Sequence, residues 1–487
     1  MKITALIWTL PSPLSARVLY KAVWRSEAGA TREAINKMLA GCAGSFCAAS
    51  AFPRWTLTRL VSRQPRPSRQ DPSLPVFQYV GKRVRRKDYV FVWGFTNTGA
   101  LGIPSFLGPG LMSEGRRKVQ FKPYRLEMPN KITSAACGYG FTLLASSIQD
   151  ITKVWGTGLN KDSQLGFQRS RRDRTKCYDL VLKPSPVALP LRLPQGTRVV
   201  QVACGRAHSL ILTDNEGVFS LGNNAYGQCG RKVIEDEDYN SSHVVHAIRG
   251  FGDQVAEVVC GQDHSLFLTV SGKVYACGWG VDGQTGLGSY NVCDTPRMMA
   301  GDLAGVPVAQ VASYCDVGLA VSRSGDLFGW GNSEYLQLAV ATDETQLHTP
   351  KHLPFNNVGK VKMAAAGDTA CALLNEAGEV FVWGYGILGK GPQLSESHTP
   401  QQIPPTLFGW SEMTPDVRVG KIRCGLHHFA AINNRGELFV WGKNTRGCLG
   451  IARLEDQYFP WRVTVPGEVL DVACGVDHMI ALIKSFI

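Results

Sequence analysis

Cysteine and histidine recur along the sequence at one fixed spacing, and together they could bind a metal ion. A Cys-Gly pair is followed, three residues after the glycine, by a histidine in four segments: Cys204 to His208, Cys260 to His264, Cys424 to His428 and Cys474 to His478. Structural zinc requires four ligands that converge on one point. One Cys and one His per repeat would be dispersed, so we predict no metal site. We expect these histidines to be hydrogen-bonded structural residues near turns.

Two glycine-rich segments fit the dinucleotide-binding fingerprint. They are Gly384-x-Gly386-x-x-Gly389 and Gly278-x-Gly280-x-x-Gly283. The fingerprint requires a helix after its last glycine, whereas Pro392 follows the first segment closely. Both segments therefore indicate turns between strands, and no glycine-rich loop has P-loop spacing. No constellation of nucleophile and base stands out either. We predict no catalytic residue and no cofactor, and any activity would be exerted on a partner protein.

The Cys-Gly signature is one half of a repeat that occurs seven times. Clear copies cover residues 202–212, 258–268, 422–432 and 472–482, and weaker copies cover 135–145, 311–321 and 364–374. The other half is a glycine turn, a β-branched or aromatic strand and then Trp-Gly or its equivalent, and it also occurs seven times. The periods of 50 to 67 residues leave room for about four short strands each.

A four-stranded unit cannot bury both of its faces alone, and stacking such units around an axis solves this problem. We therefore predict an all-β fold, a seven-bladed β-propeller with four-stranded blades. The chain begins with an unpaired Trp-Gly half at 89–102 and ends with an unpaired Cys-Gly half at 472–482. We expect the strands near Tyr89–Trp93 to pair with those near Val472–Leu482, because this pairing closes the ring and removes its free edge.

Large apolar side chains recur before the glycine of the Trp-Gly half. They are Trp93, Trp155, Trp330, Trp383 and Trp441, with Leu221 and Cys277 in the other two repeats. We expect the indoles to supply apolar area between blades, with thinner packing at 221 and 277. The glycine that follows should adopt a positive φ or allow close backbone approach. The recurring cysteines are expected to be small buried residues, not disulfide partners.

Positive charge is concentrated at the start of the chain. Residues 1–87 account for the whole net charge of +13, because residues 88–487 hold 36 basic and 36 acidic residues. Residues 1–26 contain no acid and four basic residues, a pattern typical of a mitochondrial transit peptide. A secretory signal with residues 5–10 as a short apolar core is the alternative. No stretch has the ~18 apolar residues of a spanning helix.

These features divide the chain into three parts. We predict a mitochondrial presequence region at 1–61, a Pro-rich and basic linker at 62–87, and the propeller at 88–487. The linker contains SRQPRPSRQDPSLP, which is typical of an extended spacer, and then the basic run at 82–87. The expected location is the mitochondrial matrix.

Two segments that depart from the repeat are rich in basic side chains. The first carries Arg116, Arg117, Lys118, Lys122 and Arg125, and the second carries Arg169, Arg171, Arg172, Arg174 and Lys176. They belong to consecutive repeats, so one interpretation is a shared surface for the phosphate backbone of RNA. The alternative is two solvated loops. The acidic run Glu235–Asp238 indicates a solvated turn, with a basic partner protein as the other interpretation.

The two repeat halves resemble the regulator-of-chromosome-condensation repeat. The resemblance rests on Cys-Gly-x-x-His-Ser and Gly-x-Val-Phe-x-Trp-Gly-x-Asn-x-x-Gly-Gln-Leu-Gly, and it covers residues 88–487. Segments such as CGWGVDGQTGLG and ARLEDQYFPWRV are similar to a mitochondrial branch of that family. The resemblance implies a binding scaffold and, for the nuclear founder, guanine-nucleotide exchange on a small GTPase. No copy of the founder's GTPase-wedging insertion is recognisable here, so no exchange residue is transferred.

For the mitochondrial branch the resemblance implies two functions. The first is support of mitochondrial ribosome assembly and large-subunit ribosomal RNA stability, hence of mitochondrial translation, with that RNA, assembly proteins and pseudouridine synthases as partners. The alternative is nucleotide exchange on a mitochondrial dynamin-like GTPase that promotes inner-membrane fusion, with peripheral association with that membrane. The residues themselves do not decide between RNA and a GTPase as the principal partner.

Overall fold

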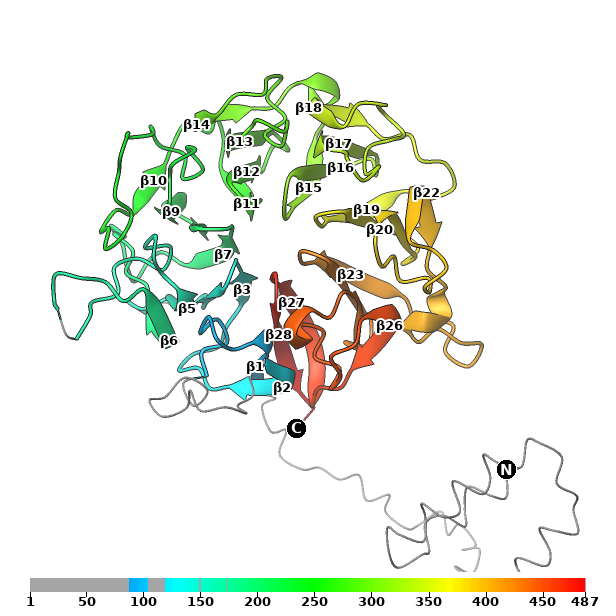
Figure 1. Cartoon of the computed structure of the whole chain (residues 1–487), viewed down its shortest axis with the longest axis horizontal. Helices are drawn as coiled ribbons and strands as arrows, with labels where there is room; N and C mark the ends of the chain where they lie inside the picture. The colour runs from blue at the N-terminus through cyan, green and yellow to red at the C-terminus, as the bar shows by residue number, and fades with distance from the viewer. Residues whose placement is uncertain (1–86, 104–118, 149, 172, 487) are drawn as a thin grey trace, which may run out of the picture. The chain divides into compact units, whose positions relative to one another are not determined.

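The repeats fold as a ring of antiparallel sheets. The structure is a computed structural model that describes residues 87–103, 119–148, 150–171 and 173–486. Seven four-stranded sheets surround one axis (Figure 1). The predicted all-β, seven-bladed β-propeller with four-stranded blades is thus confirmed. The predicted segments 1–61 and 62–87, apart from Lys87, lie outside the described residues.

Each blade holds an inner, a second, a third and an outer strand, in sequence order along the repeat. The inner strands are β3 (Ser134–Cys137), β7 (Val199–Cys204), β11 (Val255–Cys260), β15 (Val308–Ser313), β19 (Val361–Ala366), β23 (Val419–Cys424) and β27 (Gly467–Cys474). The second strands are β4 (Phe141–Ala145), β8 (His208–Thr213), β12 (His264–Thr269), β16 (Val317–Ser322), β20 (Ala370–Asn375), β24 (His428–Asn433) and β28 (His478–Ser485).

The third and outer strands complete the blades. The third strands are β5 (Val154–Leu159), β9 (Val218–Gly222), β13 (Val274–Gly278), β17 (Leu327–Asn332), β21 (Val380–Tyr385), β25 (Leu438–Gly442) and β1 (Asp88–Phe95). The outer strands are β6 (Leu180–Pro186), β10 (His246–Ile248), β14 (Cys293–Met298), β18 (Gln346–His352), β22 (Glu396–Gln402), β26 (Gln457–Val463) and β2 (Val119–Leu126). Three 3-10 turns lie between strands: η3 (Gly301–Leu303), η4 (Pro405–Phe408) and η5 (Thr445–Gly447).

One blade is built from both ends of the propeller. Its strand order is β2-β1-β28-β27, and β1 pairs with β28 from Asp88↔Lys484 to Gly94↔His478. The predicted closure by N- and C-terminal strands is confirmed. The core between this blade and its neighbour combines Phe91 and Trp93 of β1 with residues of β24, β25 and β28, so closure also buries apolar surface.

Indole N–H groups join successive blades. Trp330 donates from Nε1 to the carbonyl oxygen of Gln284 (2.9 Å), Trp383 to that of Gln337 (2.8 Å) and Trp93 to that of Cys448 (2.7 Å). In each case the carbonyl belongs to the turn after the third strand of the preceding blade. After Gln284 and Cys448 a glycine two residues later leaves room for the ring, because a Cβ on Gly450 would lie 2.6 Å from Trp93 Nε1. We call this arrangement the indole latch.

Two blades without tryptophan satisfy the same carbonyl with a hydroxyl. Leu221 and Cys277 stand at the tryptophan position and are buried. Their cross-strand partners are Ser209 and Ser265. These serines donate to the carbonyl oxygens of Gln164 (2.8 Å) and Gln228 (2.7 Å), respectively. In these two blades the joint keeps its hydrogen bond while the donor changes, whereas Nε1 of the buried Trp441 has no partner among the described residues.

Strand register corrects the expected alignment of Trp155. Trp155 pairs with Leu144, whereas Thr157 pairs with Thr142 and directly precedes the glycine with positive φ, Gly158. Thr157 therefore takes the tryptophan position in this blade, and its hydroxyl donates to the Gly99 carbonyl of the preceding blade (2.8 Å). The segment Trp-Gly-Thr-Gly contains two glycines, and only the second ends the strand as Gly94 does in β1.

We expect Trp93→Ala to weaken the whole ring. Trp93 is 0% exposed and supplies both the latch and part of the closing core. Truncation of a buried tryptophan costs roughly 3–5 kcal/mol, and the free energy of unfolding in urea should fall by that amount. Trp410→Ala is the matched control, because Trp410 is 37% exposed. Equal losses for the two variants would contradict the role assigned to the latch.

Candidate functional site

The turns between inner and second strands form one end of the central channel. They comprise residues 138–140, 205–207, 261–263, 314–316, 367–369, 425–427 and 475–477, and we call them the collar. Backbone hydrogen bonds run from turn to turn, as from Arg206 N to Gln262 O (2.9 Å) and from Asp368 N to Leu426 O (3.1 Å). The third strands end at the same face, because Trp279 N donates to Asp263 O (2.9 Å) and Tyr385 N to Thr369 O (2.8 Å).

The recurring histidines clasp neighbouring blades beneath the collar. His208 lies 3.1 Å from Ser265 Oγ, His264 3.2 Å from Ser313 Oγ and His478 3.0 Å from Thr142 Oγ1, each through Nε2. His428 Nε2 lacks such a partner, because Met479 stands where the next blade would offer a hydroxyl. The four rings are at most 1% exposed. They lie near turns as expected, and each of the three bonds crosses from one blade to the next.

Burial favours the neutral form of three of these rings. It lowers the pKa of His208, His264 and His428 to about 3. The cysteines of the Cys-Gly pairs are buried or half-buried and free of disulfides among the described residues. No group of three or more His, Cys, Asp or Glu side chains in the described part of the chain is arranged to hold a metal ion.

The collar itself is rich in carboxylates. Asp263 pairs with Arg206 (2.7 Å) and Asp477 with Arg446 (2.9 Å). Burial raises the pKa of Asp316 to about 6, and the nearby carboxylate of Asp282 adds to this effect. The collar therefore presents mixed charge, with its cations already paired.

Four aromatic side chains, two half-buried (Tyr226 and Trp279) and two exposed, stand on the same end of the propeller, in four successive blades. Tyr226 packs edge-to-face on Trp279 (centroids 4.6 Å apart), and Tyr335 stacks on Tyr385 (5.8 Å). Tyr335 is 39% exposed and Tyr385 is 48% exposed. Exposed aromatic residues of this kind are enriched in protein interfaces. We call these four residues the aromatic strip.

The aromatic strip was not predicted from the sequence. A signal was present, because tyrosine and tryptophan occupy turn positions after the third strand, where polar residues dominate elsewhere in the repeat. What periodicity could not reveal is that turns about fifty residues apart in sequence would stand side by side on one face.

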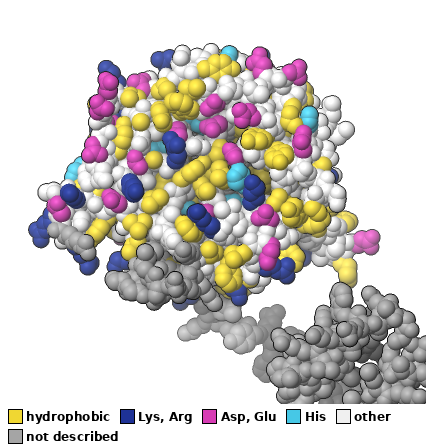
Figure 2. All heavy atoms as spheres, viewed as in Figure 1, with side chains coloured by type: hydrophobic (Ala, Val, Ile, Leu, Met, Phe, Trp, Pro, Cys, Tyr) yellow, Lys and Arg dark blue, Asp and Glu magenta, His cyan; other side chains and the backbone are white. Residues whose placement is uncertain are grey.

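The predicted basic residues do not all come together. Arg116, Arg117, Lys118 and Arg172 lie outside the described residues. Arg169, Arg171, Arg174 and Lys176 are exposed in the turn between β5 and β6, and none forms an ion pair with another described residue. This turn follows the collar end of β5, where Leu159 N donates to Gly140 O. In Figure 2, Lys and Arg side chains lie at the rim beside these strands.

Lys122 and Arg125 lie on β2 in the adjacent blade. Lys122 is exposed. Arg125 pairs with Glu127 (3.0 Å) and covers the ring of Tyr89 (4.0 Å), toward the end of the blade that lies away from the collar. The described part of the predicted RNA surface is thus the β5–β6 turn.

The segment that follows the acidic run lies against this basic turn. Ser163 Oγ donates to Tyr239 O (2.8 Å), and Cys177 N donates to Ser241 Oγ (2.8 Å). Phe167 stacks on His243 with centroids 3.7 Å apart. Within the run Glu235–Asp238, Glu237 is tied to Arg231 by a 2.6 Å ion pair with both side chains largely buried.

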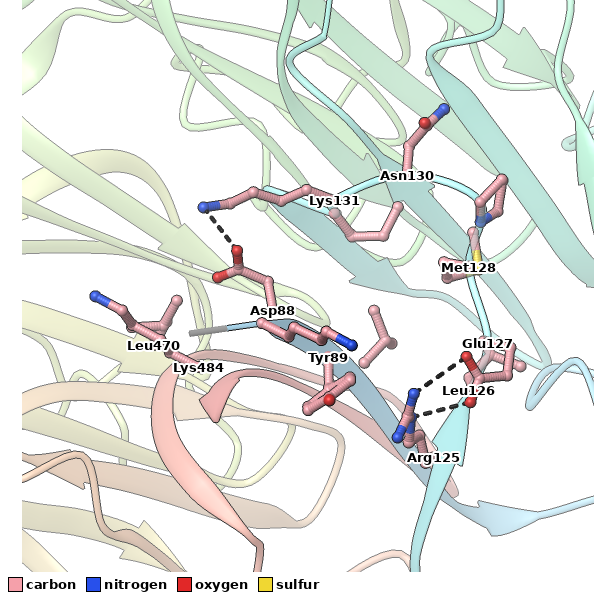
Figure 3. Close-up of a pocket in the computed structure, with 14 residues that line it drawn as sticks. Asp88, Tyr89, Arg125, Leu126, Glu127, Met128, Asn130, Lys131, Leu470 and Lys484 are labelled. Carbon is pink, nitrogen blue, oxygen red and sulfur yellow. Dashed lines mark hydrogen bonds and ion pairs between the residues drawn. The ribbon is translucent and has the colours of Figure 1, made fainter. Parts of the chain in front are cut away.

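A hollow lies where the ring closes (Figure 3). It has a volume of about 1130 Å³, and its lining includes Lys87, Tyr89, Met128, Asn130 and Lys484. Two of its cations are engaged by carboxylates, Lys131 by Asp88 (3.2 Å) and Arg125 by Glu127 (3.0 Å). The lining also includes Lys87 and Lys484, so four basic side chains face two carboxylates, Asp88 and Glu127, in this hollow.

Within the described residues, no helix is long and apolar enough to cross a membrane.

Comparison with known proteins agrees with this architecture. Residues 83–364 match the RCC1-like domain, and residues 435–482 match the regulator of chromosome condensation repeat. The chain is 64% identical to the mouse RCC1-like G exchanging factor-like protein over 90% of this chain and 96% of that one. It is 66% identical to the human protein of the same name over 85% and 90% of the two chains.

Solved structures show the same ring. The crystal structure of human WBSCR16 has a TM-score of 0.79 and 66% identity, and it covers 82% of this chain and 100% of that one. Yeast RCC1 (Prp20), solved bound to Kap60, has a TM-score of 0.66 at 20% identity and covers 82% of this chain and 90% of that one. The likeness to the yeast protein concerns the fold alone.

We expect acid to destabilise the propeller through its buried histidines. The unfolded state has the ordinary pKa of about 6.5, and the folded pKa of His208, His264 and His428 is about 3. The unfolded state therefore binds more protons between these values, and stability is lost as pH falls from 6.5 toward 3, by roughly 2 kcal/mol per histidine at pH 5. His264→Gln should flatten this loss in urea titrations, whereas exposed His398→Gln should not. Parallel curves for all three proteins would contradict the prediction.

Proposed function

Since the chain belongs to the regulator-of-chromosome-condensation family, we propose that it acts as a guanine-nucleotide exchange factor for a mitochondrial dynamin-like GTPase and thereby promotes inner-membrane fusion. The mouse and human relatives carry an exchange-factor-like name at 64% and 66% identity. The observation that carries the proposal in this chain is the aromatic strip beside the collar. The strip offers apolar anchors on one face, and the ion pairs of the collar, Asp263 with Arg206 and Asp477 with Arg446, lie at the same end.

An exchange factor needs no nucleotide site of its own. It accelerates release if it binds the nucleotide-free GTPase more tightly than the nucleotide-bound form, because a ligand shifts an equilibrium only by its differential affinity. A rigid ring suits this task, since latches between blades hold the strip in place before the partner arrives and lower the cost of ordering on binding. Tyr335 and Tyr385, stacked and half-exposed, are the anchors that the geometry favours.

We expect the full chain to accelerate release of fluorescent GDP from a purified mitochondrial dynamin-like GTPase. Tyr335→Ala and Tyr385→Ala should each reduce the acceleration about tenfold, as interface anchors do. Trp410→Ala is the control, since Trp410 is 37% exposed but follows β22 and η4 at the end opposite the collar. No acceleration by the unaltered protein would overturn the proposal, and equal effects of all three variants would remove the strip from it.

A second function is favoured by a different observation. The unpaired cations Arg169, Arg171, Arg174 and Lys176 on the exposed β5–β6 turn suit the phosphate backbone of RNA. We propose that this turn binds large-subunit ribosomal RNA in the mitochondrial matrix and that the propeller supports ribosome assembly and translation there, together with assembly proteins such as pseudouridine synthases. The matrix location rests on the composition of residues 1–26.

Neutralising Arg171, Arg172 and Arg174 to Gln should weaken binding of ribosomal RNA and reduce its salt dependence. Each lost phosphate contact lowers the slope of log K against log salt by about 1. The matched control replaces Lys360, Lys362 and Arg418, which are exposed on other blades, and should leave both quantities near their original values. Equal curves for the two triple variants across a salt titration would exclude the β5–β6 turn as the RNA contact.

A further inference from the structure

The central channel contains a cavity that the proposed functions do not use. It has a volume of about 590 Å³ and is lined by residues from all seven inner strands, which surround the axis in Figure 1. Thr133, Val200, Ala256 and Ala309 line the cavity where inner strands begin, at the end opposite the collar. Tyr314 lines it where β15 ends. The cavity therefore runs from the open end of the channel to the collar.

Two residues in this cavity break the repeat. Arg423 stands one residue before the end of β23, and the equivalent positions of the other inner strands hold Ala136, Ala203, Val259, Ala312, Ala365 and Ala473. Tyr314 stands directly after β15, and the equivalent positions hold Gly138, Gly205, Gly261, Gly367, Gly425 and Gly475. Six of seven repeats thus place a small residue at each position, so neither the arginine nor the tyrosine is required by blade geometry.

The tyrosine has an unused hydrogen-bonding group. Tyr314 is only 9% exposed, and its hydroxyl has no partner among the described residues. Its ring stacks on Tyr139 with centroids 6.0 Å apart, and this contact fixes the ring at the collar end of the cavity. A buried hydroxyl without a partner is costly, so a ligand that supplies an acceptor there would relieve that cost.

Arg423 also has N–H donors that are free to bind a ligand. Arg423 donates to Asp471 Oδ2 (3.3 Å) and to its neighbour's carbonyl, Ile422 O (3.2 Å). Its side chain is 37% exposed, and a guanidinium carries five N–H donors in a planar fork. Several of these donors thus remain for the cavity. The same fork geometry matches a carboxylate through two parallel hydrogen bonds.

The charged side chains in and beside the cavity determine which ligand charge is favoured. Lys421 and Arg423 are balanced in part by Asp471, which lies 3.6 Å from Lys421 Nζ. Glu257 accepts a hydrogen bond from Val311 N (3.4 Å), and burial raises its pKa to about 7 although the Arg423 charge opposes this. Among the described residues, Arg423 is the one Lys or Arg side chain of the lining, and a carboxylate would give its guanidinium a further acceptor beside Asp471. A dianion would face stronger repulsion from Asp471 than a single carboxylate would.

Gln201 and Gln310 also line the cavity, but their side-chain amides are already hydrogen-bonded. The Gln201 side-chain amide bonds both N and O of Val258 (3.0 Å each). Gln310 accepts from Ala364 N (2.9 Å) and donates to Ala364 O (3.2 Å). Since these amides are satisfied by the next blade, the groups left for a ligand are the Arg423 guanidinium and the Tyr314 hydroxyl.

We propose that the central channel is a binding site for a carboxylate, held by Arg423 and Tyr314, that enters from the end opposite the collar. The carboxylate belongs either to a small organic acid or to the C-terminus of a polypeptide inserted into the channel. This site is separate from the aromatic strip and the β5–β6 turn, so it does not depend on either proposed function.

Titration calorimetry on the full chain tests the proposal. The probes are hexanoate, its neutral counterpart hexanamide, and one alanine-rich pentapeptide with either a free C-terminus or a C-terminal amide. We expect heat of binding from hexanoate, from the free-acid peptide or from both, and none from the two amides. Binding of hexanoate alone would assign a small acid, and binding of the peptide alone would assign a chain terminus. No carboxylate binding, or equal binding of acids and amides, would overturn the proposal.

Arg423→Ala restores the residue of five other repeats and Tyr314→Phe keeps the buried ring, so both variants should fold. Arg423→Ala should reduce affinity for the bound carboxylate probe about tenfold or more, and Tyr314→Phe, which removes only the hydroxyl, should reduce it about fivefold. Arg249→Ala, an exposed arginine outside the channel, is the matched control. Equal affinity of Arg423→Ala and Arg249→Ala, with unchanged unfolding curves for both, would overturn the assignment of the guanidinium.

Discussion

The joint between blades is the interaction on which the rest of this molecule depends. One blade offers a carbonyl at the end of its third-strand turn, and the next blade fills the space above it with a buried donor. Trp93, Trp330 and Trp383 provide an indole N–H, Ser209 and Ser265 a hydroxyl. Each donor is fully removed from water, so loss of one partner would leave a buried polar group unsatisfied. The apolar cores also lie between blades: the core that contains Trp93 and the core that contains Trp441 each combine buried residues of two adjacent blades.

The histidine clasps also join neighbouring blades through buried hydrogen bonds. An imidazole on the second strand reaches a hydroxyl of the following blade, and burial favours the neutral form of His208 and His264. Blade-to-blade contact thus combines apolar area with a small number of directional bonds that fix the rotation between neighbours. A rigid ring results, and its upper and lower faces can differ in chemistry without altering how the blades meet.

Much of this fold could be predicted from the sequence because the repeat is local and periodic. The number of blades, the closing of β1 on β28 and the structural histidines follow from two alternating signatures, whereas the outer strands do not, and β2 lies in a segment that was expected to depart from the repeat. Trp155 shows the limit, since Trp-Gly-Thr-Gly contains two candidate strand ends and only cross-strand pairing selects Gly158. Surfaces were less predictable. The aromatic strip joins turns from different repeats. The segment after the acidic run Glu235–Asp238 packs beside the basic turn, as in the hydrogen bond between Ser163 and Tyr239.

Ring closure has a consequence for the order of events during synthesis. The blade that holds β1 near the start of the propeller also needs β27 and β28, which end at Ser485, nearly four hundred residues later. Until those last strands emerge, Trp93 has no complete blade around it and β1 exposes an unpaired edge. Contacts of such long sequence separation form late. A growing chain therefore stays open until β27 and β28 are made, and their pairing with β1 is the event that permits the ring to lock.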